Sequence, residues 1–170
     1  MSVAEKTDLK PSEADHREAE SHVVKFSYSK PEGFERAKVS VRLGDTGLLR
    51  GHIQVIKAEG GENNMHYHSK VDGMFTVLKG RLRFYGPPAQ KGGEDEVLGE
   101  FGPLEGIFIP KNARYWFENT SGEEAELMLV QGFHEFGSVS SGRTDSAPRK
   151  LKDAGADDAT NAPRYTAMVK

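Results

Sequence analysis

The stretch GGENNMHYH, residues 60–68, is the most informative part of this chain. Its two histidines, His66 and His68, are separated by one residue. In an extended strand alternate side chains point to the same face, so these imidazoles project side by side while Tyr67 points the other way. Two neighbouring imidazoles are half of a typical site for a first-row divalent metal. Residues 74–78, MFTVL, follow as a second apolar strand, and a turn is expected at Gly80.

Composition limits the class of protein. The 170 residues are enough for one domain with a hydrophobic core, and the net charge of −3 gives no overall basic field for nucleic acid. No apolar run approaches the roughly 20 residues that span a bilayer, and the first residues lack the apolar segment of a secretory signal. Cysteine is absent, which excludes disulfides and thiolate chemistry. We therefore expect a cytoplasmic protein with no nucleic-acid or membrane partner.

The pattern of strands and turns predicts an all-β domain. The 19 glycines and 8 prolines indicate many tight turns, and short strands are expected between them. These strands are predicted at residues 38–43, 48–58, 65–69, 74–78, 81–85, 107–109, 115–119 and 125–133, with a possible first strand at 22–28 and a polar loop at 89–99. Such short, regularly spaced strands are typical of a sandwich or barrel.

Three regions are expected along the chain. Residues 1–21 are charged and form a mobile arm, in which residues 11–15 can start a short helix. Residues 22–136 form the barrel. Residues 137–170, rich in Ser, Gly and Ala, form a tail that is either loosely ordered or packed on a partner subunit.

Two motifs resemble those of the cupin family. The spacing Gly60-x5-His66-x-His68 with the closing Gly80 resembles the first cupin motif, and residues 110–119, PKNARYWFEN, resemble the second. The resemblance covers roughly residues 22–136. It implies a cupin-type double-stranded β-helix, which is a small antiparallel β-barrel or jelly roll.

The resemblance also implies a metal site, of which this chain keeps two positions. Cupins usually take two His and one Glu from the first motif and one His from the second. His66 and His68 match the first two ligands. Gly73 stands at the Glu position, seven residues before Gly80, and Tyr115 stands at the second-motif His position, five residues after Pro110.

Two imidazoles alone are a weak site, so further donors are needed. Asp72 would point to the opposite face of a regular strand and could coordinate only through a bulge at Gly73. Other candidates are Tyr115 as phenol or phenolate, Gln54 or His52 on a neighbouring strand, His134, and water or substrate. The metal would be iron, manganese, zinc or nickel.

Strand alternation predicts a pocket beside the histidines. Tyr115 and Phe117 share one face, and Phe75 shares the face of Gly73, so these residues are expected to line the barrel mouth. Gln54 belongs either to the barrel interior or to an outer face. The missing side chain at Gly73 leaves room for a modest organic molecule.

Three functions remain open. The first is a metal-dependent cupin enzyme, such as an oxygenase, lyase, isomerase or cyclase, with His66 and His68 as ligands and Tyr115 as ligand, proton donor or substrate anchor. The second is a metal-free module that binds a small molecule. The third is a metal-free isomerase that uses a histidine as base and Tyr115 as acid. A homodimer is expected, with Trp116 facing outward as a possible subunit contact.

Overall fold

The computed structural model describes residues 10–58, 60–149 and 166–168. These contain one helix, α1 (Glu13–Ser21), followed by strands. The strands are β1 (Lys38–Asp45), β2 (Leu49–Ile56), β3 (Gly61–His68), β4 (Val71–Lys79), β5 (Leu82–Gly86), β6 (Glu96–Phe101), β7 (Gly106–Ile109), β8 (Tyr115–Asn119), β9 (Ala125–Phe133), β10 (Arg143–Arg149) and β11 (Thr166–Met168).

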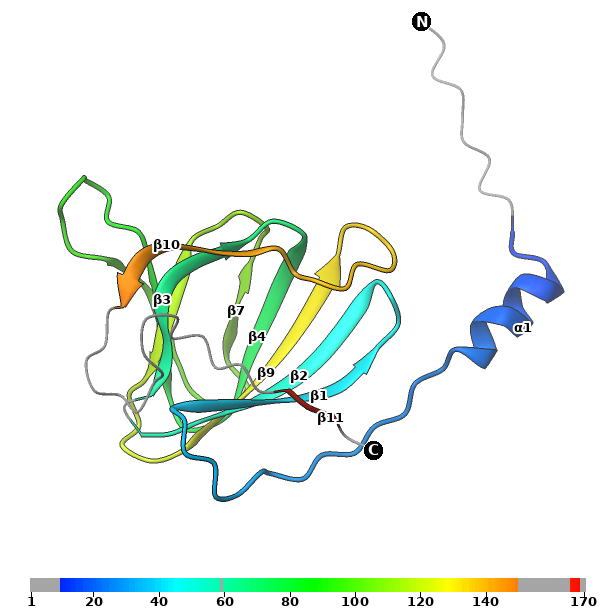
Figure 1. Ribbon diagram of the computed structural model, residues 1–170, viewed down its shortest axis with the longest axis horizontal. Helices are drawn as coiled ribbons and strands as arrows, with labels where there is room; N and C mark the ends of the chain where they lie inside the picture. Colours follow the sequence, from blue (N-terminus) through cyan, green and yellow to red (C-terminus); the bar gives the residue numbers. More distant parts are fainter. Residues whose placement is uncertain (1–9, 59, 150–165, 169–170) are drawn as a thin grey trace, which may run out of the picture.

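Two sheets enclose the core. One has the strand order β11-β1-β2-β9-β4-β7 and the other has the order β10-β3-β8-β5-β6. Apart from β11, which pairs in parallel with β1, neighbouring strands run antiparallel. Figure 1 shows the two sheets facing each other, with β3 and β10 across the barrel from β1, β2, β9 and β4. The predicted all-β jelly roll is therefore confirmed.

Helix α1 stands apart from the barrel (Figure 1). Ser12 and Asp15 form a capping box at its start, in which the Asp15 backbone N–H donates to the Ser12 hydroxyl and the Ser12 backbone N–H donates to the Asp15 carboxylate. No residue of α1 is buried. The helix is thus held by local capping rather than by packing, and no described helix is long and apolar enough to cross a membrane.

Two glycines and one asparagine occupy positions whose backbone excludes or disfavours most other residues. Gly61 has a buried backbone so close to β8 that an added Cβ would overlap the carbonyl of Phe117, which only glycine avoids. Gly80 has a φ of +83° at the predicted turn after β4, and Asn112 has a φ of +67° in the turn after Pro110. Asparagine tolerates this left-handed conformation better than most residues do, as the sequence pattern required.

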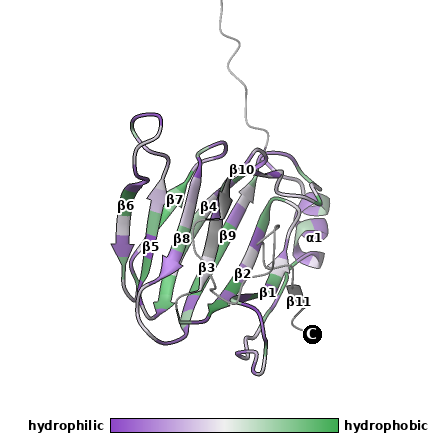
Figure 2. Ribbon diagram, turned by 60° about the vertical axis from the view of Figure 1, so that its left-hand side comes forward, coloured by the Kyte–Doolittle hydropathy of each residue, from purple (hydrophilic) through white to green (hydrophobic). Residues whose placement is uncertain are grey.

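An aromatic cluster fills the barrel beside β4, β5 and β8. Phe84 is fully buried, and its ring centroid lies 4.9 Å from that of Phe117 and 5.3 Å from that of Phe75. Aliphatic residues of β4, β5 and β9 complete the core, including Val77, Leu82 and Leu127. Figure 2 shows the corresponding mixture of hydrophobic and hydrophilic residues along the strands.

Several boundaries differ from the sequence prediction. Residues 22–28 form no strand, because they run outside the barrel, where Val23 and Phe26 remain 68% and 62% exposed. The end of the predicted loop at 89–99 is part of β6, which pairs with β5. Residues 143–149 of the predicted tail form β10, which pairs with β3, so this part of the chain contributes to the second sheet.

The surroundings of Trp116 are formed by the chain itself. Trp116 does face away from the barrel interior, but it is only 7% exposed. Its indole stacks on Tyr85 at 4.1 Å, and its Nε1–H donates to Asp95 at 2.8 Å. The chain's own loop before β6 therefore covers this residue.

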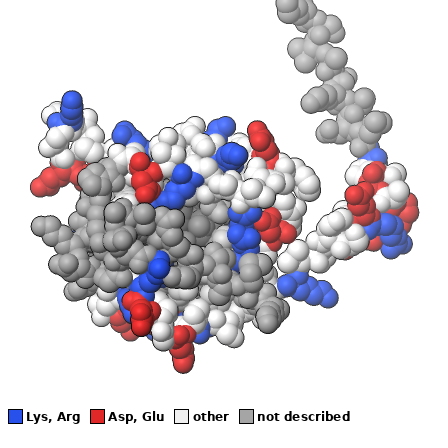
Figure 3. Space-filling model, in the orientation of Figure 1, with Lys and Arg blue, Asp and Glu red and all other residues white. Residues whose placement is uncertain are grey.

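Charged side chains of both signs are interspersed on the face shown in Figure 3. Over the described residues of this face, basic side chains form no continuous patch, because acidic groups lie between them. This distribution agrees with the absence of an overall basic charge.

Candidate functional site

His66 is held rigidly inside the barrel. It lies on β3, opposite Tyr115 of β8, and is 1% exposed. Its Nδ1–H donates to the backbone carbonyl of Asn64 at 2.8 Å. A carbonyl can only accept, so this bond places the proton on Nδ1 and leaves the ligating lone pair on Nε2.

His68 lies on the same face of β3 but is half-buried, at the edge of a pocket. Its Nδ1 shares a hydrogen bond of 2.8 Å with the Ser141 hydroxyl, which comes from the segment before β10. The ring centroids of His66 and His68 are 5.2 Å apart and the rings are nearly perpendicular. The strand alternation therefore brings the two imidazoles together as predicted.

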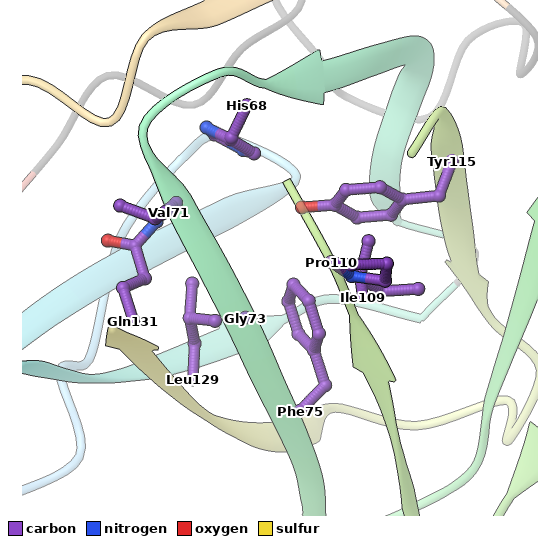
Figure 4. Close-up of a pocket in the computed structure, with 9 residues that line it drawn as sticks. All are labelled: His68, Val71, Gly73, Phe75, Ile109, Pro110, Tyr115, Leu129 and Gln131. Atoms are coloured by element: carbon purple, nitrogen blue, oxygen red, sulfur yellow. The ribbon is translucent and has the colours of Figure 1, made fainter. Parts of the chain in front are cut away.

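Tyr115 completes a cluster of three rings. It is 4% exposed, and its ring centroid lies 4.4 Å from that of His66 and 6.3 Å from that of His68. Figure 4 shows its hydroxyl end turned toward the side of the pocket where His68 lies. The prediction that Tyr115 lies in the pocket is thus in agreement with its position.

The pocket lies beside Gly73, which stands at the position where cupins usually have a glutamate ligand. It has an empty volume of about 230 Å³, which includes space open to solvent. Its walls are formed by His68, Val71, Gly73, Phe75, Ile109, Pro110, Tyr115, Leu129 and Gln131 (Figure 4). A Cβ at Gly73 would lie 3.1 Å from Phe75 Cε2 and 3.5 Å from Leu129 Cδ1, so a side chain there would occupy this space.

Asp72 and His134 lie outside this cluster. The register of β4 against β9 is regular around Gly73, so no bulge turns Asp72 inward. Its carboxylate instead accepts hydrogen bonds from the Lys111 backbone N–H at 2.8 Å and from His134 Nε2 at 3.2 Å. These two bonds, the first more than the second, lower the pKa of Asp72. Asp72 and His134 therefore pair with each other, and the bulge that Asp72 would need in order to face the histidines does not form.

Gln54 and Phe117 face the interior but do not line the pocket. Phe117 is 1% exposed and belongs to the aromatic core. Gln54 is 7% exposed, and it shares the inward face of β2 with His52 and Ile56, of which Ile56 belongs to the core. Of the two orientations open for Gln54, the structure selects the interior.

The inner face of β2 also carries His52, which is 8% exposed. Burial lowers the pKa of the His52 imidazole to about 4, and the charges of Arg42 and Arg50 lower it in the same direction. Its Nδ1 lies 3.3 Å from the Ser40 hydroxyl. His52 is therefore neutral at neutral pH.

The donors present fit a metal only in part. His66 and His68 offer two imidazoles, and Tyr115 offers a phenol beside them. Among the described residues, no group of three or more His, Cys, Asp or Glu side chains could hold a metal ion. A cation here would have to rely on the two imidazoles, on the phenol and on small molecules entering at Gly73.

Solved structures share this fold. A recombinant oxalate oxidase in complex with glycolate has a TM-score of 0.55 and 14% identity, covering 72% of this chain and 62% of its own. Peruvianin-I, a cysteine peptidase from Thevetia peruviana latex, has a TM-score of 0.54 and 13% identity, and the match covers 72% of this chain and 77% of Peruvianin-I. The cupin domain of Schizosaccharomyces pombe Cnp3 has a TM-score of 0.49 and 14% identity, and the match covers 63% of this chain and 68% of the Cnp3 domain.

The similarities to oxalate oxidase and Peruvianin-I, whose TM-scores exceed 0.5, support the jelly-roll fold that the sequence predicted, and at this level of identity they concern the fold alone. No family model and no curated protein sequence matches the chain. The chain spans about three fifths of the length of the oxalate oxidase chains.

Sequence reasoning missed parts of the pocket wall. Gln131 and Leu129 lie on β9 and face inward, which the strict alternation of that strand could have revealed. Ser141 had no sequence signal as a partner of His68, because it comes from a Ser- and Gly-rich segment 73 residues away.

Proposed function

We propose that this chain is a metal-binding cupin that acts on a small organic molecule in the pocket between His68 and Tyr115. His66 and His68 would hold a divalent ion such as iron, manganese, zinc or nickel. The cytoplasmic location and the homodimer stay predictions.

The bond from His66 Nδ1–H to the Asn64 carbonyl carries this proposal. Histidines that bind metals usually donate their other ring N–H to a backbone carbonyl or carboxylate, which fixes the tautomer and orients the ring. His66 has this arrangement. The adjacent His68 faces the same side and is open to the pocket.

Side chains of the pocket supply the remaining functions. Tyr115 would hold a proton on its hydroxyl and donate it to, or anchor, a bound molecule. Phe75 and Leu129 limit access of water, and the Gln131 amide can orient a polar group. A bound divalent ion would act as a Lewis acid that polarises an oxygen of the substrate.

Metal binding is tested directly by elemental analysis. Protein freed of metal by dialysis is loaded separately with Fe²⁺, Mn²⁺, Zn²⁺ and Ni²⁺, desalted and analysed. We expect about one equivalent of at least one metal per chain. The double variant His66→Ala/His68→Ala should retain none. His134→Ala, which removes a histidine outside the cluster, should bind metal like the wild type.

A gain-of-function variant makes the test sharper. Gly73→Glu places a carboxylate at the vacant position, and its Cβ would lie 3.1 Å from Phe75 Cε2, so the edge of that ring must move by a few tenths of an ångström to admit the Cβ. We expect metal affinity to rise by about tenfold or more, equal to about 1.4 kcal/mol. Failure of both the wild type and Gly73→Glu to retain any of the four metals would refute the proposal.

A second candidate is a metal-free pocket, either a binding module or an acid–base isomerase that uses His68 and Tyr115. The lack of a third His, Asp or Glu in the described cluster favours it. It predicts that ligand binding, or a bell-shaped pH–rate profile, persists in protein freed of metal.

A further inference from the structure

A second group of polar side chains lies inside the barrel, next to the pocket wall. On β9, Leu129 and Gln131 line the pocket. Across to β2, Leu129 is opposite His52 and Gln131 is opposite Arg50. Residues directly opposite each other in an antiparallel pair share a face, so His52 and Arg50 continue the inward-facing surface of the sheet from β9 to β2.

The next strand, β1, continues the same surface. Arg42 is opposite His52, and Ser40 is opposite Gln54. Lys38, at the start of β1, has its ammonium 5.4 Å from the centre of the Phe117 ring, which belongs to the buried core. The inward face of β1 and β2 therefore combines cationic and amide side chains.

Arg50 is bound to other groups of the chain. Its Nε–H donates to Asp45 at 2.7 Å, its Nη2 donates to the Ser138 carbonyl, and its guanidinium lies 4.5 Å from the Phe133 ring centre. Asp45 is thus engaged by the neighbouring arginine. Arg42 forms no ion pair of this kind within the described residues, although its charge acts on both Asp45 and His52.

Two polar atoms on this surface have no hydrogen-bond partner within the described chain. They are Nε of Arg42 and Oε1 of Gln54, both buried at the atom level. Gln54 is 7% exposed as a residue. An unpaired donor on a cation is costly, because the buried N–H has given up its hydrogen bonds to water without gaining another partner. The carboxamide of Gln54 can turn to present either its oxygen or its NH₂ group.

We propose that Arg42 and Gln54 form an oxyanion subsite, which recognises the carboxylate of a small organic acid whose other end reaches the pocket. The Arg42 guanidinium would donate to the carboxylate, and the Gln54 amide would donate a second hydrogen bond. The apolar walls at Leu129 and Phe75 would contact the carbon skeleton. This deepens the proposed small-molecule function by naming the substrate class, and it requires no metal.

The arrangement also explains why the chain keeps a cation at this position. Arg42 lies near Arg50 and Lys38, and all three cations oppose protonation of His52. A cation whose buried Nε–H has no hydrogen-bond partner within the described chain destabilises the ligand-free protein and attracts an anion, although Asp45 offsets part of its charge. Replacing Arg42 should therefore not lower the stability of the ligand-free protein. If Arg42 had only a structural role, its replacement would lower that stability.

The test uses full-length protein from which metal and chelator have both been removed, because chelators carry carboxylates. Acetate, malonate and inorganic phosphate are titrated at constant ionic strength, with malonamide as the neutral isostere. NMR signals of the Arg42 Nε–H and the Gln54 side-chain amide report binding. We expect both to shift with the anions and to be unaffected by malonamide. Tighter binding of malonate supports an organic acid, and tighter binding of phosphate supports the same oxyanion subsite with a phosphate ester.

Variants distinguish specific recognition of the anion by Arg42 from a general effect of positive charge on anion binding. Arg42→Met should weaken anion binding by about ten- to hundredfold, and Arg42→Lys should retain part of it. Arg114→Met removes an exposed arginine beside β8 and serves as the matched control with unchanged binding. The melting temperature of ligand-free Arg42→Met should equal or exceed that of the wild type.

Three results would overturn the subsite: absence of anion-induced shifts in the wild type, equal weakening by Arg42→Met and Arg114→Met, or equal binding of malonamide. Loss of anion binding in His66→Ala/His68→Ala with normal binding in Arg42→Met would also overturn it, because the anion would then lie at the histidines. Metal binding is measured separately, so failure of the metal proposal is distinguishable.

Discussion

Replacing His52 by glutamine should make the protein more resistant to acid. His52 is 8% exposed on the inner face of β2, and burial lowers its pKa from 6.5 to about 4. In the unfolded chain the imidazole takes up a proton at higher pH than in the folded protein. The stability that depends on a neutral His52 is therefore present above about pH 6.5 and is lost as the pH falls toward the folded-state pKa.

The magnitude follows from these two pKa values. At about pH 7.5 both states are neutral and the effect vanishes. At about pH 5 most unfolded chains carry the proton and most folded chains do not, so linkage gives a loss of about 2 kcal/mol in the free energy of unfolding. Glutamine keeps a polar side chain opposite Arg42 and Leu129 but cannot titrate.

The assay is urea unfolding of metal-free protein at both pH values. The wild type should lose about 2 kcal/mol more than His52→Gln between them. His16→Gln, an exposed position on α1, is the control and should behave like the wild type. Parallel losses in the wild type and His52→Gln would refute the argument that burial among cations keeps this histidine neutral.

Two further predictions concern the fold that holds the site. Phe84→Ala should lower the free energy of unfolding by about 3–5 kcal/mol, because it removes a fully buried ring packed on Phe75 and Phe117, and Phe84→Leu should cost less in the same urea titration. Asn119→Asp should cost about 3 kcal/mol near neutral pH, because its Nδ2 donates to the carbonyls of Lys57 and Glu123 and a carboxylate would oppose them. An Asn119→Asp variant that unfolds at the wild-type urea midpoint would contradict this role.

Much of the fold was predictable because its signals are local. The alternation within residues 66–68 placed two imidazoles on one face, and the alternation in β8 placed Tyr115 with Phe117 inward. Turn positions at Gly80 and Asn112 followed from residues that tolerate positive φ. The strand predicted at residues 22–28 does not form. β-branched and aromatic residues indicate an extended chain, but they do not show whether a partner strand is present.

The sequence by itself determined the strand pattern, the two histidines side by side and the vacant ligand position at Gly73. Only the tertiary structure decided what surrounds them. It buried His66, left His68 at the pocket edge, brought Ser141 to His68 and aligned Arg42, His52 and Leu129 across three strands. The physical reason is that side-chain alternation is set within one strand, whereas a site depends on which strands pair and in what register.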